Sequence, residues 1–124
     1  MPTRAIIARP TEGGGFAGRY LHRDGAPDTA TELLRDFVLV VYRGNVEAAT
    51  RYLLDVHPSG WQSLPASDGG GECMCHDAGG DMGLLTHKSD SGTEYAYILN
   101  PDRLEVLARA GDGWTPVHTI AWTA

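Results

Sequence analysis

The stretch LEVLARAGDGWTPVHTIAW, residues 104–122, decides the fold because it contains two β-prone segments joined by a turn. Segments 104–109 and 114–122 each have strand character, and the glycines of AGDG at 110–113 allow a tight reversal between them. The sequence therefore predicts an antiparallel pair of strands. Alternation along the second strand places four residues on one half-buried face: Trp114, His118, Ile120 and Trp122.

Further strands are expected before this pair and near the start of the chain. Segments 82–88 and 93–99 precede the pair described above, and NPDR at 100–103 is a turn sequence with proline at its second position. Together they predict an antiparallel meander. Segments 4–9 and 16–22 flank the turn TEGGG and predict a hairpin. In its second strand, one face carries Phe16, Gly18, Tyr20 and His22, and the other carries Ala17, Arg19 and Leu21.

Two helices are expected between these strands. The first begins at an N-cap, Asp28 or Thr29, and places one apolar stripe on Leu33, Leu34, Phe37, Val38 and Val41. The run FVLVVY at 37–42 fits a buried strand equally well, but the stripe begins before it and therefore favours a helix. Asn45 caps the second helix, which ends at His57 because Pro58 follows. Its buried side comprises Val46, Ala49, Leu53 and Val56, and a short strand is expected at 61–64.

These segments predict an α+β fold in a single domain, 1–124. An N-terminal β-hairpin is followed by two helices and then by a C-terminal antiparallel meander, which form one sheet with the helices on one face. A chain of 124 residues has room for one ordinary domain. Segment 65–81 contains two glycine clusters and little periodicity, so it is expected to be a long, acidic, glycine-rich loop.

The composition is that of an acidic globular domain. Lys and Arg number 10 and Asp and Glu number 16, which gives a net charge of −6 and a pI near 5.2. This balance argues against a general binder of nucleic acids or anionic membranes. No apolar run approaches the roughly 18 residues of a membrane span. The first residues also lack the apolar segment of a secretion signal, so a cytoplasmic location is expected.

The densest cluster of reactive side chains is ECMCHD, residues 72–77, within the glycine-rich loop. Cysteine sulfur and histidine nitrogen are preferred ligands of zinc. Cys73, Cys75 and His76 therefore form a candidate zinc site, in which the metal would organise the loop. A fourth ligand must come from elsewhere, and the candidates are His22, Asp24 and His87.

Other interpretations of the two cysteines stay open. A disulfide between Cys73 and Cys75 would close a very tight, strained ring, and a reducing cytoplasm disfavours it. In a cysteine-dependent hydrolase or transferase, Cys75 would act as the nucleophile, with His22 or His76 as its base and Asp24 orienting that base. In a third interpretation both thiols are loop residues without a chemical role.

Charge is distributed unevenly along the chain. Segment 66–94 carries six acidic residues against Lys88 alone, whereas the residues up to Arg23 are net positive. An acidic loop can dock on the arginine-rich hairpin of the same chain, imitate phosphates toward a protein partner, or stay solvated. The acids are Asp68, Glu72, Asp77, Asp81, Asp90 and Glu94.

Five stretches together resemble a group of small uncharacterised actinobacterial and phage-type proteins. They are MPTRA at 1–5, GRYLHRDGAP at 18–27, HPSGW at 57–61, CMCH at 73–76 and EYAYIL at 94–99. Members of that group begin MGTRA and carry the stretches HWDGYP, HPxGW, CYCHG and EYxYxx in the same order. This chain departs from them at Pro2, Arg23, Ala26, Met74 and Asp77. The resemblance implies that the His22/Asp24 and Cys73/Cys75/His76 clusters belong to one recurring pattern, and it implies no activity.

We therefore expect a small intracellular accessory protein that binds a protein partner, with a loop organised by zinc. The alternative is a cysteine-dependent hydrolase or transferase that uses Cys75. The last strand of the meander is expected at the edge of the sheet, where it can pair two copies into a homodimer.

Overall fold

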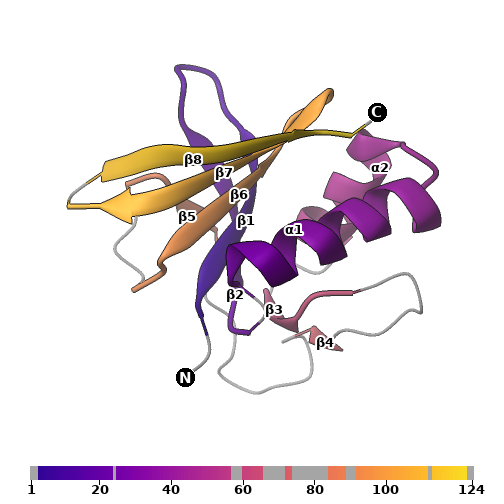
Figure 1. Ribbon diagram of the computed structural model, residues 1–124, viewed down its shortest axis with the longest axis horizontal. Helices are drawn as coiled ribbons and strands as arrows, with labels where there is room; N and C mark the ends of the chain where they lie inside the picture. The colour runs from indigo at the N-terminus through magenta and orange to yellow at the C-terminus, as the bar shows by residue number, and fades with distance from the viewer. Residues whose placement is uncertain are drawn as a thin grey trace.

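One mixed β-sheet carries two helical segments on one of its faces (Figure 1). This architecture comes from a computed structural model that describes residues 3–23, 25–56, 60–65, 72–73, 84–88, 92–111 and 113–122. The strands are β1 (Ala5–Pro10), β2 (Phe16–Leu21), β3 (Trp61–Ser63), β4 (Glu72–Cys73), β5 (Leu85–Thr86), β6 (Tyr95–Leu99), β7 (Arg103–Ala110) and β8 (Gly113–Ala121). The predicted α+β class is confirmed.

The strands lie in the order β4-β3-β2-β1-β6-β7-β8, and β5 pairs separately with β2. The antiparallel meander is confirmed for β6, β7 and β8 but is wrong for β5, because Leu85 pairs with Gly18 of β2. The sheet also contains two parallel pairings that the sequence analysis did not predict, β1 with β6 and β2 with β3. These pairings join segments far apart in the chain, which local turn sequences do not specify.

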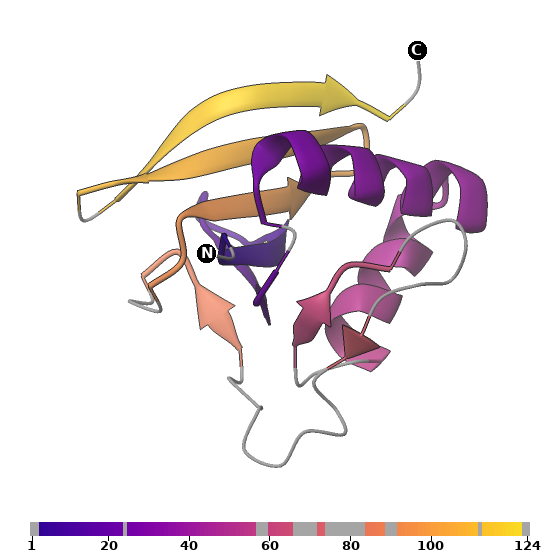
Figure 2. The same ribbon diagram turned by 60° about the horizontal axis from the view of Figure 1, so that its bottom comes forward.

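Two short strands share the outer edge of β2 and diverge from it (Figure 2). β5 pairs with its first residues, whereas β3 pairs with Leu21 and accepts backbone hydrogen bonds of 2.9 Å from His22 and Arg23. β4 in turn pairs with β3. The prediction of a continuous loop over 65–81 is therefore wrong at 72–73, where a strand too short to show periodicity completes the ladder.

Both helices end in a wider, π-helical turn. α1 (Pro27–Asp36) continues as η1 (Phe37–Val41), so the prediction of a helix over FVLVVY is confirmed. α2 (Val46–Arg51) continues as η2 (Tyr52–Val56). Because the wider turn shifts the side-chain stripe, Val56 is 58% exposed, and its predicted burial is wrong.

The predicted N-cap is confirmed for α2 and is wrong for α1. The Asn45 side chain accepts a hydrogen bond of 3.1 Å from the backbone of Ala48, as predicted. The N-cap of α1 is Ala26 rather than Asp28 or Thr29. Pro27 explains the earlier start, because proline fits the first helical position, where no backbone donor is needed.

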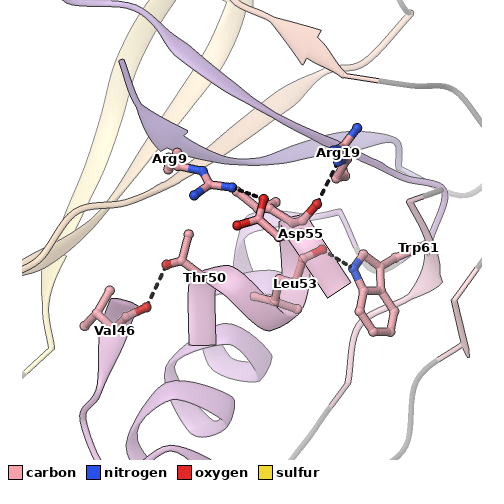
Figure 3. A network of polar contacts seen from close by, with 8 residues as sticks. Arg9, Arg19, Val46, Thr50, Leu53, Asp55 and Trp61 are labelled. Atoms are coloured by element: carbon pink, nitrogen blue, oxygen red, sulfur yellow. Dashed lines mark hydrogen bonds and ion pairs between the residues drawn. The ribbon is translucent and has the colours of Figure 1, made fainter. Parts of the chain in front are cut away.

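Side chains from the sheet satisfy the last carbonyl groups of η2 (Figure 3). The Trp61 Nε1 group donates to the Leu53 carbonyl at 2.9 Å, and the Arg19 Nε group donates to the Leu54 carbonyl at 2.8 Å. Arg9 forms an ion pair with Asp55 beside them. These donors meet the negative end of the helix and dock it onto β1, β2 and β3.

The start of α1 is held by a buried hydrogen bond from the centre of the sheet. The Tyr97 hydroxyl of β6 donates to the Gly25 carbonyl at 2.6 Å, and the Gly25 amide donates to the Thr3 carbonyl at 3.2 Å. A side chain at Gly25 would overlap the Thr3 carbonyl. The chain therefore enters α1 at a position set by β6 and by the residues before β1.

A β-bulge changes which residues of β8 face the helices. Val106 pairs with His118 and Leu107 pairs with Pro116, so Val117 is an extra residue in β8. The prediction that Trp114 shares a face with His118 is wrong for this reason. Trp114 lies on the face opposite the helices, where its ring packs against Phe16 with centroids 5.4 Å apart.

The pairing of β1 with β2 leaves no room for a side chain at Gly18. A β-carbon there would overlap the Ile7 carbonyl and lie 2.5 Å from the α-carbon of Ala8. We expect Gly18→Ala to lower the free energy of unfolding by about 3 kcal/mol, measured by urea denaturation. Gly113→Ala is the control, because its nearest neighbour lies 4.0 Å away. Equal stability of the two variants would contradict the observed register.

Burial raises the pKa of Tyr97 well above its usual value of 10.0, and the nearby Tyr95 and Asp28 raise it further. The native state therefore keeps this proton while the unfolded chain releases it above pH 10, so the contribution of Tyr97 to stability is complete below pH 10 and declines above it. We expect Tyr97→Phe to cost about 2 kcal/mol at neutral pH. The difference from wild type should shrink above pH 10 in urea denaturation; a constant difference would contradict this assignment.

Candidate functional site

The structure describes only part of the predicted cysteine and histidine cluster. Cys75, His76 and Asp24 lie outside the described residues, and for Cys73 the structure gives the backbone alone. Cys73 pairs with Trp61, which pairs with Leu21, so one strand separates the backbone of Cys73 from β2. The sheet therefore brings Cys73 toward the end of β2 where His22 follows. The zinc site, the nucleophile and the disulfide stay predictions.

His22 is half-buried and already contacts a neighbour through one ring nitrogen. Its Nδ1 atom lies 2.9 Å from the Tyr20 hydroxyl, and the two ring centroids are 5.9 Å apart. Both residues lie on the face of β2 opposite the helices, in line with the predicted alternation. The other ring nitrogen, Nε2, is therefore the atom through which His22 would bind a metal or accept a proton.

His87 lies at the opposite end of β2 from His22. Its backbone amide donates to the Phe16 carbonyl at 3.2 Å, and its ring packs edge-on against Phe16 at 5.9 Å. An extended strand rises about 3.3 Å per residue, so roughly 20 Å separates the two histidines. They therefore cannot both bind the same metal ion, and His22 is the one that lies near the backbone of Cys73. Within the described ranges, no three His, Cys, Asp or Glu side chains gather as a metal site.

Two adjoining hollows lie between α1 and β8, on the helix face of the sheet. One, of about 400 Å³, lies between α1–η1 and Ile120. The other, of about 460 Å³, lies between the start of α1 and the bulge at Val117 and His118. Thr31 lines both, so the two hollows adjoin along the helix, and we treat them together as one groove. We call it the α1–β8 groove.

The helix wall of the α1–β8 groove consists of two rows of side chains at intervals of four residues. The inner row is Pro27, Thr31, Arg35 and Leu39. The outer row is Asp28, Glu32, Asp36 and Val40. Residues four apart lie on the same side of a helix, one turn above another. The outer row therefore presents three carboxylates in line, and all three residues are exposed.

The opposite wall is an edge strand that the helices leave uncovered. β8 is last in the sheet order, and none of the described strands pairs with its outer side. Most of its residues are exposed, including Val117 at 51%. The strand that α1 contacts is its neighbour β7. An exposed strand edge beside a helix can receive an extended segment of another chain.

A third hollow, of about 610 Å³, lies at the carboxyl ends of the parallel strands β1 and β6. Its two arginines are already paired within the chain. Arg9 forms an ion pair with Asp55, and Arg51 forms one of 3.1 Å with Glu47. This hollow therefore offers less charge to a ligand than the α1–β8 groove does.

Comparison with protein-family models, with curated proteins and with solved structures finds no match for the chain. Among the described residues, no helix is long and apolar enough to cross a membrane. The resemblance to small actinobacterial and phage-type proteins stays a prediction. The geometry of the site is therefore the only basis for a proposed function.

Sequence reasoning missed the α1–β8 groove, although two of its signals can be read in the chain. Asp28, Glu32 and Asp36 recur at helical spacing before the apolar run, and β8 follows the last turn. The decisive feature is the bulge at Val117, which turns the exposed part of β8 toward α1. A bulge in an otherwise alternating strand has no clear local signature.

Zinc analysis of the purified chain tests the metal prediction. We expect about one zinc ion per chain, and a clear loss in Cys73→Ser/Cys75→Ser. His22→Asn should also lower the zinc content, whereas His87→Asn should leave it unchanged because His87 lies at the far end of β2. A loss with His87→Asn and none with His22→Asn would contradict this arrangement.

Proposed function

We propose that the protein is a small binding protein that holds a protein partner in the α1–β8 groove. The partner contributes an extended segment, which adds to the outer edge of β8 and turns alternate side chains toward α1. The observation that carries this proposal is that an uncovered edge strand and a helix wall line two adjoining hollows from opposite sides.

The edge of β8 limits where such a segment can add. Pro116 has no backbone N–H group, and the bulge at Val117 interrupts the strand beside it. The available edge is therefore 117–121, made of the bulged residue Val117 and the regular stretch 118–121. It contains all the groove-lining residues of β8: Val117, His118 and Ile120. Pro116 and the bulge thus protect the edge from unspecific pairing and confine an added segment to 117–121.

Exposed apolar side chains lie at both ends of the groove. Val40 is 57% exposed at the η1 end, and Val117 is 51% exposed at the start of the groove. Burying such side chains against a partner is favourable because it removes apolar surface from water. Together with backbone pairing along β8, these two residues provide affinity that does not depend on one particular partner sequence.

The proposal extends to the cellular location of the protein. A cytoplasmic location, the expectation stated from the sequence, is part of this proposal. In the alternative, a cysteine-dependent hydrolase or transferase, Cys75 is the nucleophile with His22 or His76 as its base, and of these residues and Asp24 only His22 is described. No described contact supports that alternative.

A display library of short random peptides, selected on the immobilised protein, tests the proposal. Enriched peptides should bind wild type and should bind the double variant Val40→Ser/Val117→Ser about tenfold more weakly, because both changes remove apolar contact in the groove. Calorimetric titration with one enriched peptide measures the difference.

Val41→Ser/Val56→Ser is the matched control, since Val41 is 44% and Val56 58% exposed and neither lines the α1–β8 groove. Its affinity for the peptide should equal that of wild type. If both double variants weaken binding equally, or if neither does, the groove is not the binding site and the proposal fails.

A further inference from the structure

We infer that the segment received by the α1–β8 groove is basic, with Lys or Arg at alternate positions of an extended stretch. This inference rests on the proposed function and specifies the chemistry of its partner. It follows from the outer row of α1, where the three carboxylates face the groove and are not opposed by an equal number of cations. Of the groove-lining residues, Arg35 alone carries a permanent positive charge.

The spacing of the carboxylates fits an extended chain. Four residues of a helix rise about 6 Å, and two residues of a strand rise about 7 Å. α1 and β8 run in the same direction along the groove, because the start of α1 lies opposite Val117 and its later turns lie opposite Ile120. Every second side chain of an added strand therefore meets one carboxylate, and long basic side chains absorb the small mismatch.

The surroundings keep these carboxylates available. Asp28, Glu32 and Asp36 are all exposed, so each can approach a cation without losing its hydration entirely. Two exposed acids elsewhere in the chain are instead paired within it, Glu47 with Arg51 and Asp102 with Arg103. Exposed ion pairs are individually weak, but three in line together multiply the affinity about tenfold.

A second copy of the chain is a poorer occupant of the same edge. Two β8 strands paired antiparallel around a twofold axis would continue the sheet with all helices on one face. The two α1 helices would then lie on either side of the paired strands. The acidic outer rows of both copies would face each other. Like charges opposed in this way are unfavourable, and each chain carries a net charge of −6. A basic segment relieves this repulsion.

Three synthetic peptides of equal length test the inference by calorimetric titration. Valine occupies alternate positions in all three, and the remaining positions are lysine, serine or glutamate. We expect the lysine peptide to bind about tenfold more tightly than the serine peptide and the glutamate peptide to bind more weakly than both. Added salt should weaken the lysine peptide most.

Two variants of equal charge change locate the effect. Asp28→Asn/Glu32→Gln/Asp36→Asn should reduce the affinity for the lysine peptide to that for the serine peptide. The control Glu12→Gln/Glu47→Gln/Asp102→Asn removes three acids from outside the groove and should leave the preference for lysine intact.

The outcomes separate this inference from the proposed function. If all three peptides bind equally and Val40→Ser/Val117→Ser still weakens them, the groove binds peptides but the basic preference is wrong. If no peptide depends on the groove, the proposed function fails with it. Self-association in sedimentation velocity that Val117→Ser abolishes would make a second copy the occupant and would overturn the inference.

Discussion

The hydrogen bond from the Tyr97 hydroxyl to the Gly25 carbonyl determines where α1 crosses the sheet. It is 2.6 Å long, lies in the core, and joins the middle of β6 to the residue that leads into the helix. A buried carbonyl without a partner is unfavourable, so this contact fixes one position for the start of α1. From there α1 packs against β7 and leaves β8 uncovered, as Figures 1 and 2 show. The α1–β8 groove is a consequence of that placement.

The far end of the helical layer is fixed by a different kind of contact. The last carbonyl groups of η2 accept hydrogen bonds from Arg19 and Trp61, which extend from β2 and β3 (Figure 3). The two helices are thus anchored to the sheet at the beginning of one and at the end of the other. The turn between them, at Arg43 and Gly44, adopts positive φ angles of 52° and 86°.

Local sequence signals predicted the elements whose causes are local. Asn45 caps α2 because its side chain reaches the backbone three residues on, and NPDR makes the turn between β6 and β7. The parallel pairing of β1 with β6 was not predicted, because it depends on the packing of the whole intervening chain. The face of Trp114 was wrong because the extra residue Val117 reverses the alternation along β8.

The candidate site was predicted from chemistry, and the structure adds a site defined by shape. The cysteines and the histidine of ECMCHD can be recognised as candidate ligands from their residue types alone. The groove is lined by common residues, such as Thr31 and Val40, and only their positions in the fold make them part of a binding site. Their exposure depends on how far α1 extends over the sheet, which no single segment encodes. Helical spacing shows that Asp28, Glu32 and Asp36 form a row along one side of α1. It does not show that this side faces β8.

Amide hydrogen exchange along β8, with and without the lysine-valine peptide, tests the central claim most directly. The account predicts that amides within 117–121 exchange more slowly when the peptide is bound, because backbone pairing protects the outer edge of the strand. The amides of β1, which are already paired on both sides, should be unchanged. Binding that leaves exchange within 117–121 unaltered would contradict the addition of a strand to β8.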